Sequence, residues 1–170
     1  MSRDFLGIPS PAEISMELAE GRAAWLALAV DTCRITMPGE GEPVLDEATG
    51  KRTSPAPVVV YEGPCLLQIR ADVNSNVVEV TAGEREWAYQ TSILSIPIFA
   101  PSASDLMPSQ RATYPNGALG DPGEVRIDMT ATMLTSAEDP SLVGNVFHIK
   151  ATLTKTRATA RRLRVTETVG

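Results

Sequence analysis

The sequence predicts a mainly β protein, a small antiparallel β-barrel or sandwich with an N-terminal α-helix and two long loops. Three observations lead to this fold class. Short segments alternate apolar and polar residues with a period of two, one segment near the N-terminus has helical periodicity, and two connections are rich in proline and glycine. The 170 residues suit a single domain, residues 1–170, and a hydrophobic fraction of 43% is enough for its core.

The helix is predicted over residues 11–29. Ser10-Pro11-Ala12-Glu13 is a capping box with proline at the first helical position. Apolar residues then recur at helical spacing, namely Ile14, Leu18, Trp25, Leu28 and Ala29. This stripe predicts either a helix packed on the protein's own sheet, the more common arrangement, or a helix that docks on a partner. The partner-docking candidates are Ile14, Leu18 and Trp25.

The β-barrel is predicted over residues 31–168. Cys33, Ile35 and Met37 alternate with polar neighbours, which predicts a half-buried strand. Further strands are predicted at 58–61, 65–70, 77–81, 87–97 and 123–129, followed by a turn near residue 139 and a terminal hairpin. Pro64 predicts a break between the second and third strands, because proline cannot donate to a sheet.

The two long loops are predicted at residues 38–57 and 100–123. The first is rich in proline, glycine and glutamate, and its tip is expected at residues 46–51. The second holds four prolines and three glycines and has little periodicity. Loops of this length in a compact domain are usually functional or disordered.

Charge is distributed unevenly along the chain. Residues 1–149 hold nine Lys/Arg and twenty Asp/Glu, a net charge of −11, whereas residues 150–170 carry +5. The basic side chains of the terminal hairpin are candidates for an interface between subunits, namely Lys155, Arg157, Arg161, Arg162 and Arg164. They could face an acidic surface of another copy, form a solvated strand face, or contact DNA. The whole-chain charge of −6 and the lack of interleaved aromatic residues disfavour DNA.

No group of residues indicates an active site. His148 is the only histidine, and it falls on the polar face of its predicted strand. Cys33 and Cys65 are the only cysteines, and buried free thiols are more common in strands than a lone disulfide. Neither metal-ligand spacing nor a phosphate-binding glycine loop is present. We therefore predict a protein that is not an enzyme and uses no cofactor or metal.

No segment has the length and hydrophobicity of a membrane span, and the N-terminus has no apolar run. We therefore expect a soluble protein, intracellular at synthesis, that makes no contact with a membrane.

Several segments together resemble a known family. They are Arg34-Ile35-Thr36, Asp46-Glu47-Ala48-Thr49-Gly50, Val60-Tyr61-Glu62-Gly63-Pro64-Cys65-Leu66, Asp139-Pro140-Ser141-Leu142-Val143-Gly144-Asn145-Val146-Phe147 and Ala158-Thr159-Ala160-Arg161-Arg162-Leu163-Arg164-Val165. In this order behind an N-terminal helix, they make the chain similar to the head-completion proteins of long-tailed phages (siphophages), the head-to-tail stopper or connector group. Tyr-Glu-Gly-Pro and Asp-Pro-x-Leu-Val-Gly are the better markers.

The resemblance implies a structural virion protein with no catalytic residues. Its protomers would form a homo-oligomeric ring of six or twelve copies, as symmetry matching to a portal suggests. The ring would lie in the neck of the virion, between portal or adaptor proteins and the tail terminator or tail tube proteins. It would retain the packaged genome, let double-stranded DNA pass without sequence-specific binding, and assemble in the host cytoplasm.

In related stoppers a flexible loop gates the channel. By the same resemblance, the acidic residues of the two long loops are the channel or gating candidates, namely Glu40, Glu42, Asp46, Glu47, Asp105 and Asp121.

Two alternative functions stay open. The nearer one is another ring of the same neck, either a head-tail adaptor, which is expected to be mostly helical, or a tail terminator. The more distant one is a small ligand-binding β-barrel. Such a barrel needs an aromatic-lined pocket, for which Trp25, Trp87 and Tyr89 are few and scattered.

Overall fold

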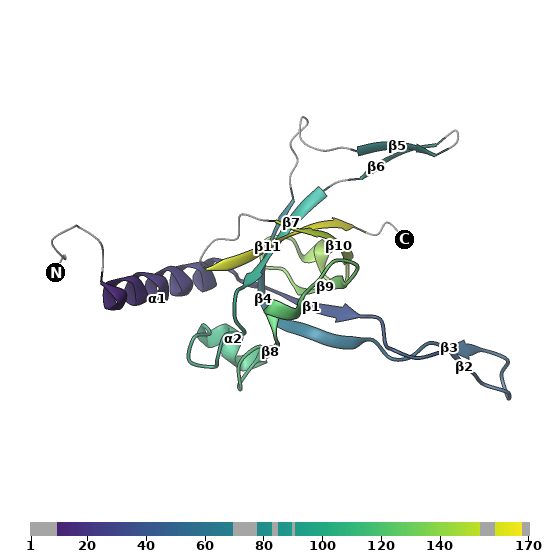
Figure 1. Cartoon of the computed structure of the whole chain (residues 1–170), viewed down its shortest axis with the longest axis horizontal. Coiled ribbons are helices and arrows are strands. Elements are labelled where there is room, and N and C mark those ends of the chain that lie inside the picture. Colours follow the sequence, from purple (N-terminus) through teal and green to yellow (C-terminus); the bar gives the residue numbers. More distant parts are fainter. Residues whose placement is uncertain (1–9, 70–77, 83–84, 90, 154–158, 168–170) are drawn as a thin grey trace.

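A closed antiparallel barrel forms the centre of the computed structural model, which describes residues 10–69, 78–82, 85–89, 91–153 and 159–167. The strands follow one another around the barrel in the order β1-β9-β10-β11-β7-β4, and pairing of β1 with β4 closes it (Figure 1). Their bounds are β1 (Asp31–Met37), β4 (Val58–Ile69), β7 (Thr91–Pro97), β9 (Thr130–Thr135), β10 (Val146–Thr152) and β11 (Ala160–Glu167). The mainly β fold class is confirmed, and of the two expected architectures the barrel is formed.

Side chains from alternate positions of the strands fill the barrel interior. Successive side chains of a strand point to opposite faces, so the period of two seen in the sequence supplies this core. The largest fully buried side chains of the barrel strands are Tyr61, Phe147, Ile35, Leu94, Ile96, Met133, Ile149, Leu163 and Val165. Closing the barrel also removes the unpaired strand edges that an open sheet would expose.

The break predicted at Pro64 is wrong, because β4 runs through it without interruption. On one side of β4, Pro64 lies opposite Thr32 of β1. On the other side β4 changes neighbours. It pairs with β8 (Leu119–Gly120) at residues 61–62 and with β7 at residues 66–69. Neither neighbour pairs with Pro64, so its missing N–H interrupts no ladder on that side.

The strand predicted at 123–129 is also wrong. The 3₁₀ turn η1 (Pro122–Glu124) occupies its start, and β9 begins only after its end. Asp128 has a φ of 68°, in the left-handed region that strand residues avoid, and its N–H donates to the carbonyl of Ile149 at 3.0 Å. The apparent alternation thus comes from a turn that exposes Ile127 and buries its apolar neighbours.

Two predicted hairpins are present. In the first, β5 (Val78–Ala82) pairs with β6 (Arg85–Tyr89), and the strand predicted at 87–97 is divided between β6 and β7. The terminal hairpin pairs β10 with β11. Before it, the predicted turn is the 3₁₀ turn η2 (Pro140–Leu142), capped by Asp139, whose Oδ1 accepts the Ser141 N–H at 3.0 Å.

The predicted loop 38–57 is an arm that extends the β1–β4 hairpin beyond the barrel (Figure 1). Two short strands, β2 (Val44–Leu45) and β3 (Arg52–Thr53), pair along it. Its tip is a turn in which the Gly50 N–H donates to the Asp46 carbonyl at 2.7 Å. We call residues 40–55 the arm.

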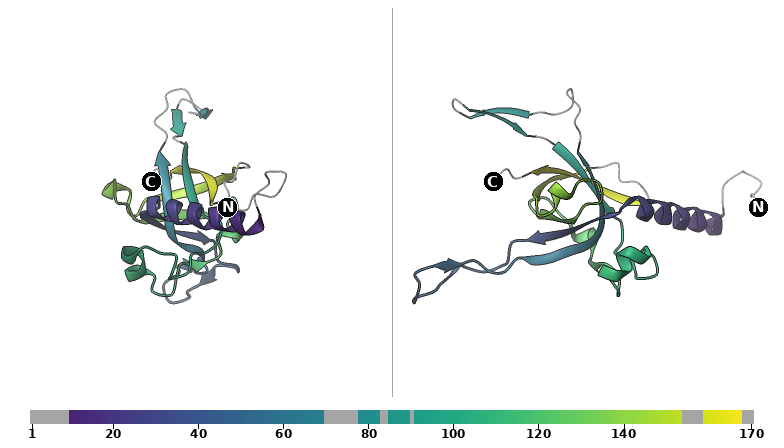
Figure 2. Two further views of the ribbon diagram at one scale, coloured as in Figure 1. Left: turned by 90° about the vertical axis from the view of Figure 1, so that its left-hand side faces the viewer. Right: turned by 180° about the vertical axis from the view of Figure 1, so that it is seen from behind.

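Helix α1 (Pro11–Leu28) begins at the predicted capping box. The Ser10 N–H donates to Oε2 of Glu13 at 2.8 Å, and the Glu13 N–H donates to Oγ of Ser10 at 3.3 Å. The expectation that the helix packs along its own sheet is wrong, since Leu26 is the only buried residue of α1. The helix leaves the barrel at its C-terminal end and points away from the arm (Figures 1 and 2).

The segment at 100–123 is ordered and packed against the barrel. It contains the short helix α2 (Pro108–Thr113), β8 and the start of η1. Leu106, Gln110 and Tyr114 are buried. The Gln110 side chain donates through Nε2 to the Ala29 carbonyl at 2.7 Å, and so connects α2 to the end of α1.

Candidate interaction surfaces

The basic interface candidates separate into different environments. Arg161 lies at the start of β11 and donates through Nη1 to the carbonyls of Pro122 and Gly123, at 2.7 and 3.0 Å. It therefore fixes η1 within its own chain. Arg162 is half-buried and Arg164 is exposed.

The other two basic candidates, Lys155 and Arg157, lie outside the described residues.

The acidic gating candidates in the arm are all exposed, namely Glu40, Glu42, Asp46 and Glu47. Asp46 stabilises the tip of the arm, because its carboxylate accepts hydrogen bonds from Oγ1 of Thr49 at 2.7 Å and the N–H of Ala48 at 3.0 Å. The bond from Thr49 is the main reason that the pKa of Asp46 is lowered, with a smaller contribution from Ala48.

The acidic candidates in the segment 100–123 hold turns. Oδ2 of Asp105 accepts the N–H and the hydroxyl of Ser102, at 3.0 and 2.6 Å. Oδ1 of Asp121 accepts the Gly123 N–H at 2.7 Å. Since this segment is packed on the barrel and the arm is not, the arm is the one of the two predicted loops that extends freely into solvent.

The partner-docking candidates lie on one face of α1. Ile14 is exposed, with 43% of its surface accessible, whereas Leu18 and Trp25 are half-buried. Ala19, Ala23 and the buried Leu26 lie on an adjoining face of α1, with Arg22 between the two faces. Trp25, one of the predicted docking candidates, lies at the border between them and lines the groove described next.

The second face of α1 lines a groove of about 310 Å³ against the segment that follows β7. We call this the helix groove. Its lining residues are Ala19, Arg22, Ala23, Trp25, Leu26, Pro97, Ile98, Phe99, Ala100, Pro101, Ser104, Asp105 and Thr159. Phe99 is 60% exposed at its rim, and the Arg22 guanidinium lies 4.8 Å from the centre of the Phe99 ring. An aromatic residue between prolines in Pro-Ile-Phe-Ala-Pro was the signal that could have located the groove.

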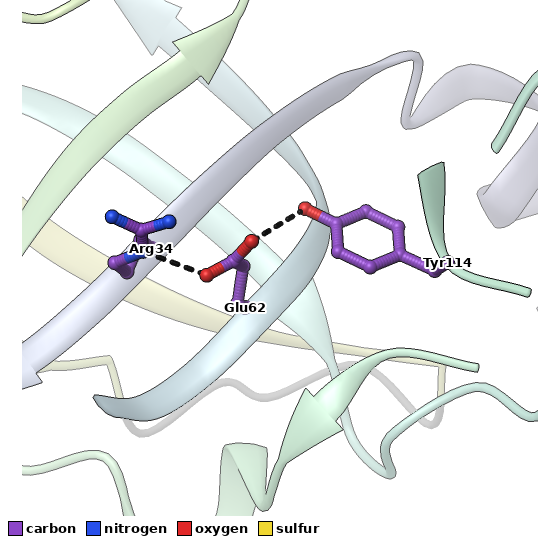
Figure 3. Close-up of polar contacts among 3 residues, drawn as sticks. All are labelled: Arg34, Glu62 and Tyr114. Carbon is purple, nitrogen blue, oxygen red and sulfur yellow. Dashed lines mark hydrogen bonds and ion pairs between the residues drawn. The ribbon is translucent and has the colours of Figure 1, made fainter. Parts of the chain in front are cut away.

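A polar cluster on the outside of the barrel joins three elements (Figure 3). Nε of Arg34 in β1 contacts Oε2 of Glu62 in β4 at 2.6 Å, and the Tyr114 hydroxyl donates to Oε1 of Glu62 at 3.4 Å. Burial, and next the charge of Glu62, raises the pKa of Tyr114 to about 12. Glu62 therefore links the end of α2 to the barrel wall, and the role of these three side chains is structural.

The groups with chemical potential are dispersed. Cys33 and Cys65 are both free and buried, as expected, and burial raises the pKa of the Cys65 thiol. His148 is half-buried on β10. Within the described ranges, no three His, Cys, Asp or Glu side chains are arranged to hold a metal ion. None of the helices described here is both long and apolar enough to cross a bilayer.

The fold and these surfaces define a small closed β-barrel protein from which α1 and the arm project. By comparison with protein families, the chain belongs to a family of unknown function, DUF6093, whose model matches residues 21–166. Neither a curated protein nor a solved structure matches the chain.

Proposed function

We propose that the protein is a structural component of a tailed-phage virion, the head-to-tail stopper of the neck. Copies of the chain would form a ring of six or twelve subunits around the DNA channel, below the portal or adaptor and above the tail terminator or tail tube. The ring would retain the packaged DNA and offer the tail its attachment surface. Assembly would take place in the host cytoplasm.

The observation that carries this proposal is that α1 and the arm leave the barrel in opposite directions (Figures 1 and 2). Both bear large apolar side chains in solvent, including Met16 at 61% and Val44 at 70% exposure. Apolar surface of this kind marks an interaction site when it is contiguous. A barrel with two such ends is suited to contact a neighbour on each side, as a ring subunit must.

The two marker segments of the resemblance occupy positions with a structural requirement. At Gly63 of the Tyr-Glu-Gly-Pro segment, a Cβ would come within 2.7 Å of the Ala118 side chain and 2.8 Å of the Tyr61 hydroxyl. Gly144 of the Asp-Pro-x-Leu-Val-Gly segment has a φ of 85°, which favours glycine. Both segments thus carry a glycine that the geometry of this fold requires.

The charge pattern is consistent with a DNA channel. A surface with a net charge of −6 offers phosphates little counter-charge, so DNA can pass without being held. The exposed acidic side chains of the arm, Glu40, Glu42, Asp46 and Glu47, add to this acidic surface.

The alternatives receive less support. A head-tail adaptor is expected to be mostly helical, whereas the described residues are mainly β. A ligand-binding barrel requires an interior cavity, but bulky side chains such as Phe147, Tyr61 and Leu94 fill this one. A tail terminator would share the ring architecture, so an experiment must separate it from a stopper.

Removing the gene from the phage that encodes this chain tests the proposal. We expect full heads that lack tails and lose DNA, seen by electron microscopy and as nuclease-sensitive DNA. Overlong tails would indicate a terminator. Complete, infectious particles would refute a role in the neck.

A further inference from the structure

The arm exposes apolar side chains that its own chain does not cover. Leu45 is 53% exposed and Val44 is 70% exposed, both on β2. An isolated two-stranded hairpin is marginally stable in water, because it has no second layer to pack against. The apolar side chains of the arm can therefore be buried only by contact with another surface.

The helix groove is a matching surface of the right size. The small, exposed side chains of Ala19 and Ala23 line it on α1, and the exposed ring of Phe99 lies at its rim. Its volume of about 310 Å³ is at the lower end of pockets that bind small ligands, and suits a few aliphatic side chains.

The arm extends from the side of the barrel opposite to α1, the helix that lines the groove (Figures 1 and 2). An arm therefore cannot fold back into the groove of its own chain, but it can reach the groove of another. Contact between two different surfaces of identical subunits is heterologous, and it closes into a ring where the rotation permits.

Charges around the two surfaces are complementary. The arm carries Glu42 before β2 and carries Lys51 and Arg52 on the β3 side, all exposed. The groove presents both the cation of Arg22 and the exposed carboxylate of Asp105 at its lining. An inserted arm can therefore place the acidic residue before β2 toward Arg22 and the basic residues of the β3 side toward Asp105.

We propose that the arm of one copy inserts into the helix groove of the next copy, with Val44 and Leu45 buried against Ala19, Ala23 and Phe99. This inference rests on the ring of the proposed function and names the contact that builds it. Each subunit then offers one arm and accepts one, and every subunit of a closed ring makes the same two contacts.

Two variants that damage one surface each provide the test. Leu45→Asp places a charge in the apolar arm, and Ala23→Trp fills the groove from an exposed helix position. We expect each variant to be monomeric where the wild type is oligomeric, with a dissociation constant at least tenfold larger. Light scattering after size exclusion measures both. Val143→Asp, at a site 47% exposed, and Ala24→Trp, on another face of α1, are the matched controls that keep the oligomer.

Mixing the two variants distinguishes this contact from others. The Leu45→Asp chain retains its groove and the Ala23→Trp chain retains its arm, so together they can form one contact and no more. We expect a 1:1 dimer in the mixture and monomers in each variant alone. Circular dichroism spectra equal to wild type show that both variants are folded.

Three outcomes would overturn the inference. They are a wild-type chain that stays monomeric up to about 1 mM, variants that assemble as the wild type does, and a mixture that remains monomeric. The proposed function fails separately: if the variants behave as expected but the phage lacking the gene has normal tails, the arm contact stands without the neck function.

Discussion

Within one strand, neighbouring arginines have different roles that the sequence alone does not separate. Arg161 and Arg164 both lie in β11, and the residue pattern made both of them interface candidates. The structure commits Arg161 to the carbonyls of Pro122 and Gly123 and leaves Arg164 exposed. The difference arises because η1 lies next to the start of β11, a tertiary contact that no local pattern encodes.

Substituting the two arginines separately should reveal this difference. Arg161→Gln removes two charge-assisted hydrogen bonds to backbone carbonyls, so we expect the free energy of unfolding to fall by about 2 kcal/mol. Arg164→Gln is the control, with a change of about 0.5 kcal/mol or less because that side chain is exposed. Urea unfolding of both variants measures this, and equal effects would contradict the assignment.

Tyr114 should make stability depend on alkaline pH. Its pKa is raised to about 12 in the folded protein by burial and by Glu62, whereas the pKa of an unfolded tyrosine is about 10. Between these values the unfolded chain loses a proton that the folded chain keeps, so stability falls as pH rises from about 10 to about 12. Below this window Tyr114 is protonated in both states and contributes no pH dependence.

Tyr114→Phe isolates this effect from the other alkaline groups. Its free energy of unfolding should decline less than that of the wild type across the same window, with only a small change at neutral pH because the hydrogen bond to Glu62 is long, at 3.4 Å. Urea titrations at several pH values measure the difference. Parallel curves for the two proteins would show that Tyr114 ionises normally.

At the scale of elements, the local sequence predicted the helix and strand whose start or buried face depends on neighbouring residues alone. The capping box at Ser10 and Glu13 predicted the start of α1 within its own four residues, and the alternation at Cys33 and Ile35 predicted β1. The continuity of β4 through Pro64 was not predictable, because it depends on where β7 and β8 pair with that strand.

The connection from α2 to the barrel contains a position, Gly120, where no residue with a Cβ atom fits. Gly120 in β8 has a φ of 78°, and a Cβ there would lie 1.9 Å from the carbonyl oxygen of Val60. Gly120→Ala should therefore cost about 3 kcal/mol or more, since the backbone itself must move. Gly50 is a matched control, because it has a φ of 68° and a Cβ added there would meet nothing within 4 Å.

Gly50→Ala should cost only about 1 kcal/mol, the strain of a left-handed residue in open space. Thermal and urea unfolding of the two variants provide the comparison. Similar losses for both would mean that strain alone, and not the approach of Val60, explains the need for glycine at position 120.

For the whole molecule, the fold class was predictable because barrel strands carry their core in a simple alternation. The outward path of α1 was not, since its apolar residues fit equally well a helix packed on a sheet. The helix groove was missed for a related reason. It combines α1 with residues 97–105, which are distant in sequence, and only the folded chain brings them together.

The barrel should fold, and be as stable, without the arm. Replacing residues 38–57 with Asn-Gly joins Met37 to its strand partner Val58 through a two-residue turn of the type favoured in hairpins. A shorter loop costs less entropy to close, so we expect stability equal to the wild type or greater by about 1 kcal/mol. Urea unfolding followed by circular dichroism, at a concentration where both proteins are monomeric, measures this. A broad transition or a lower midpoint would show that the arm belongs to the barrel's cooperative unit and is not a separate docking element.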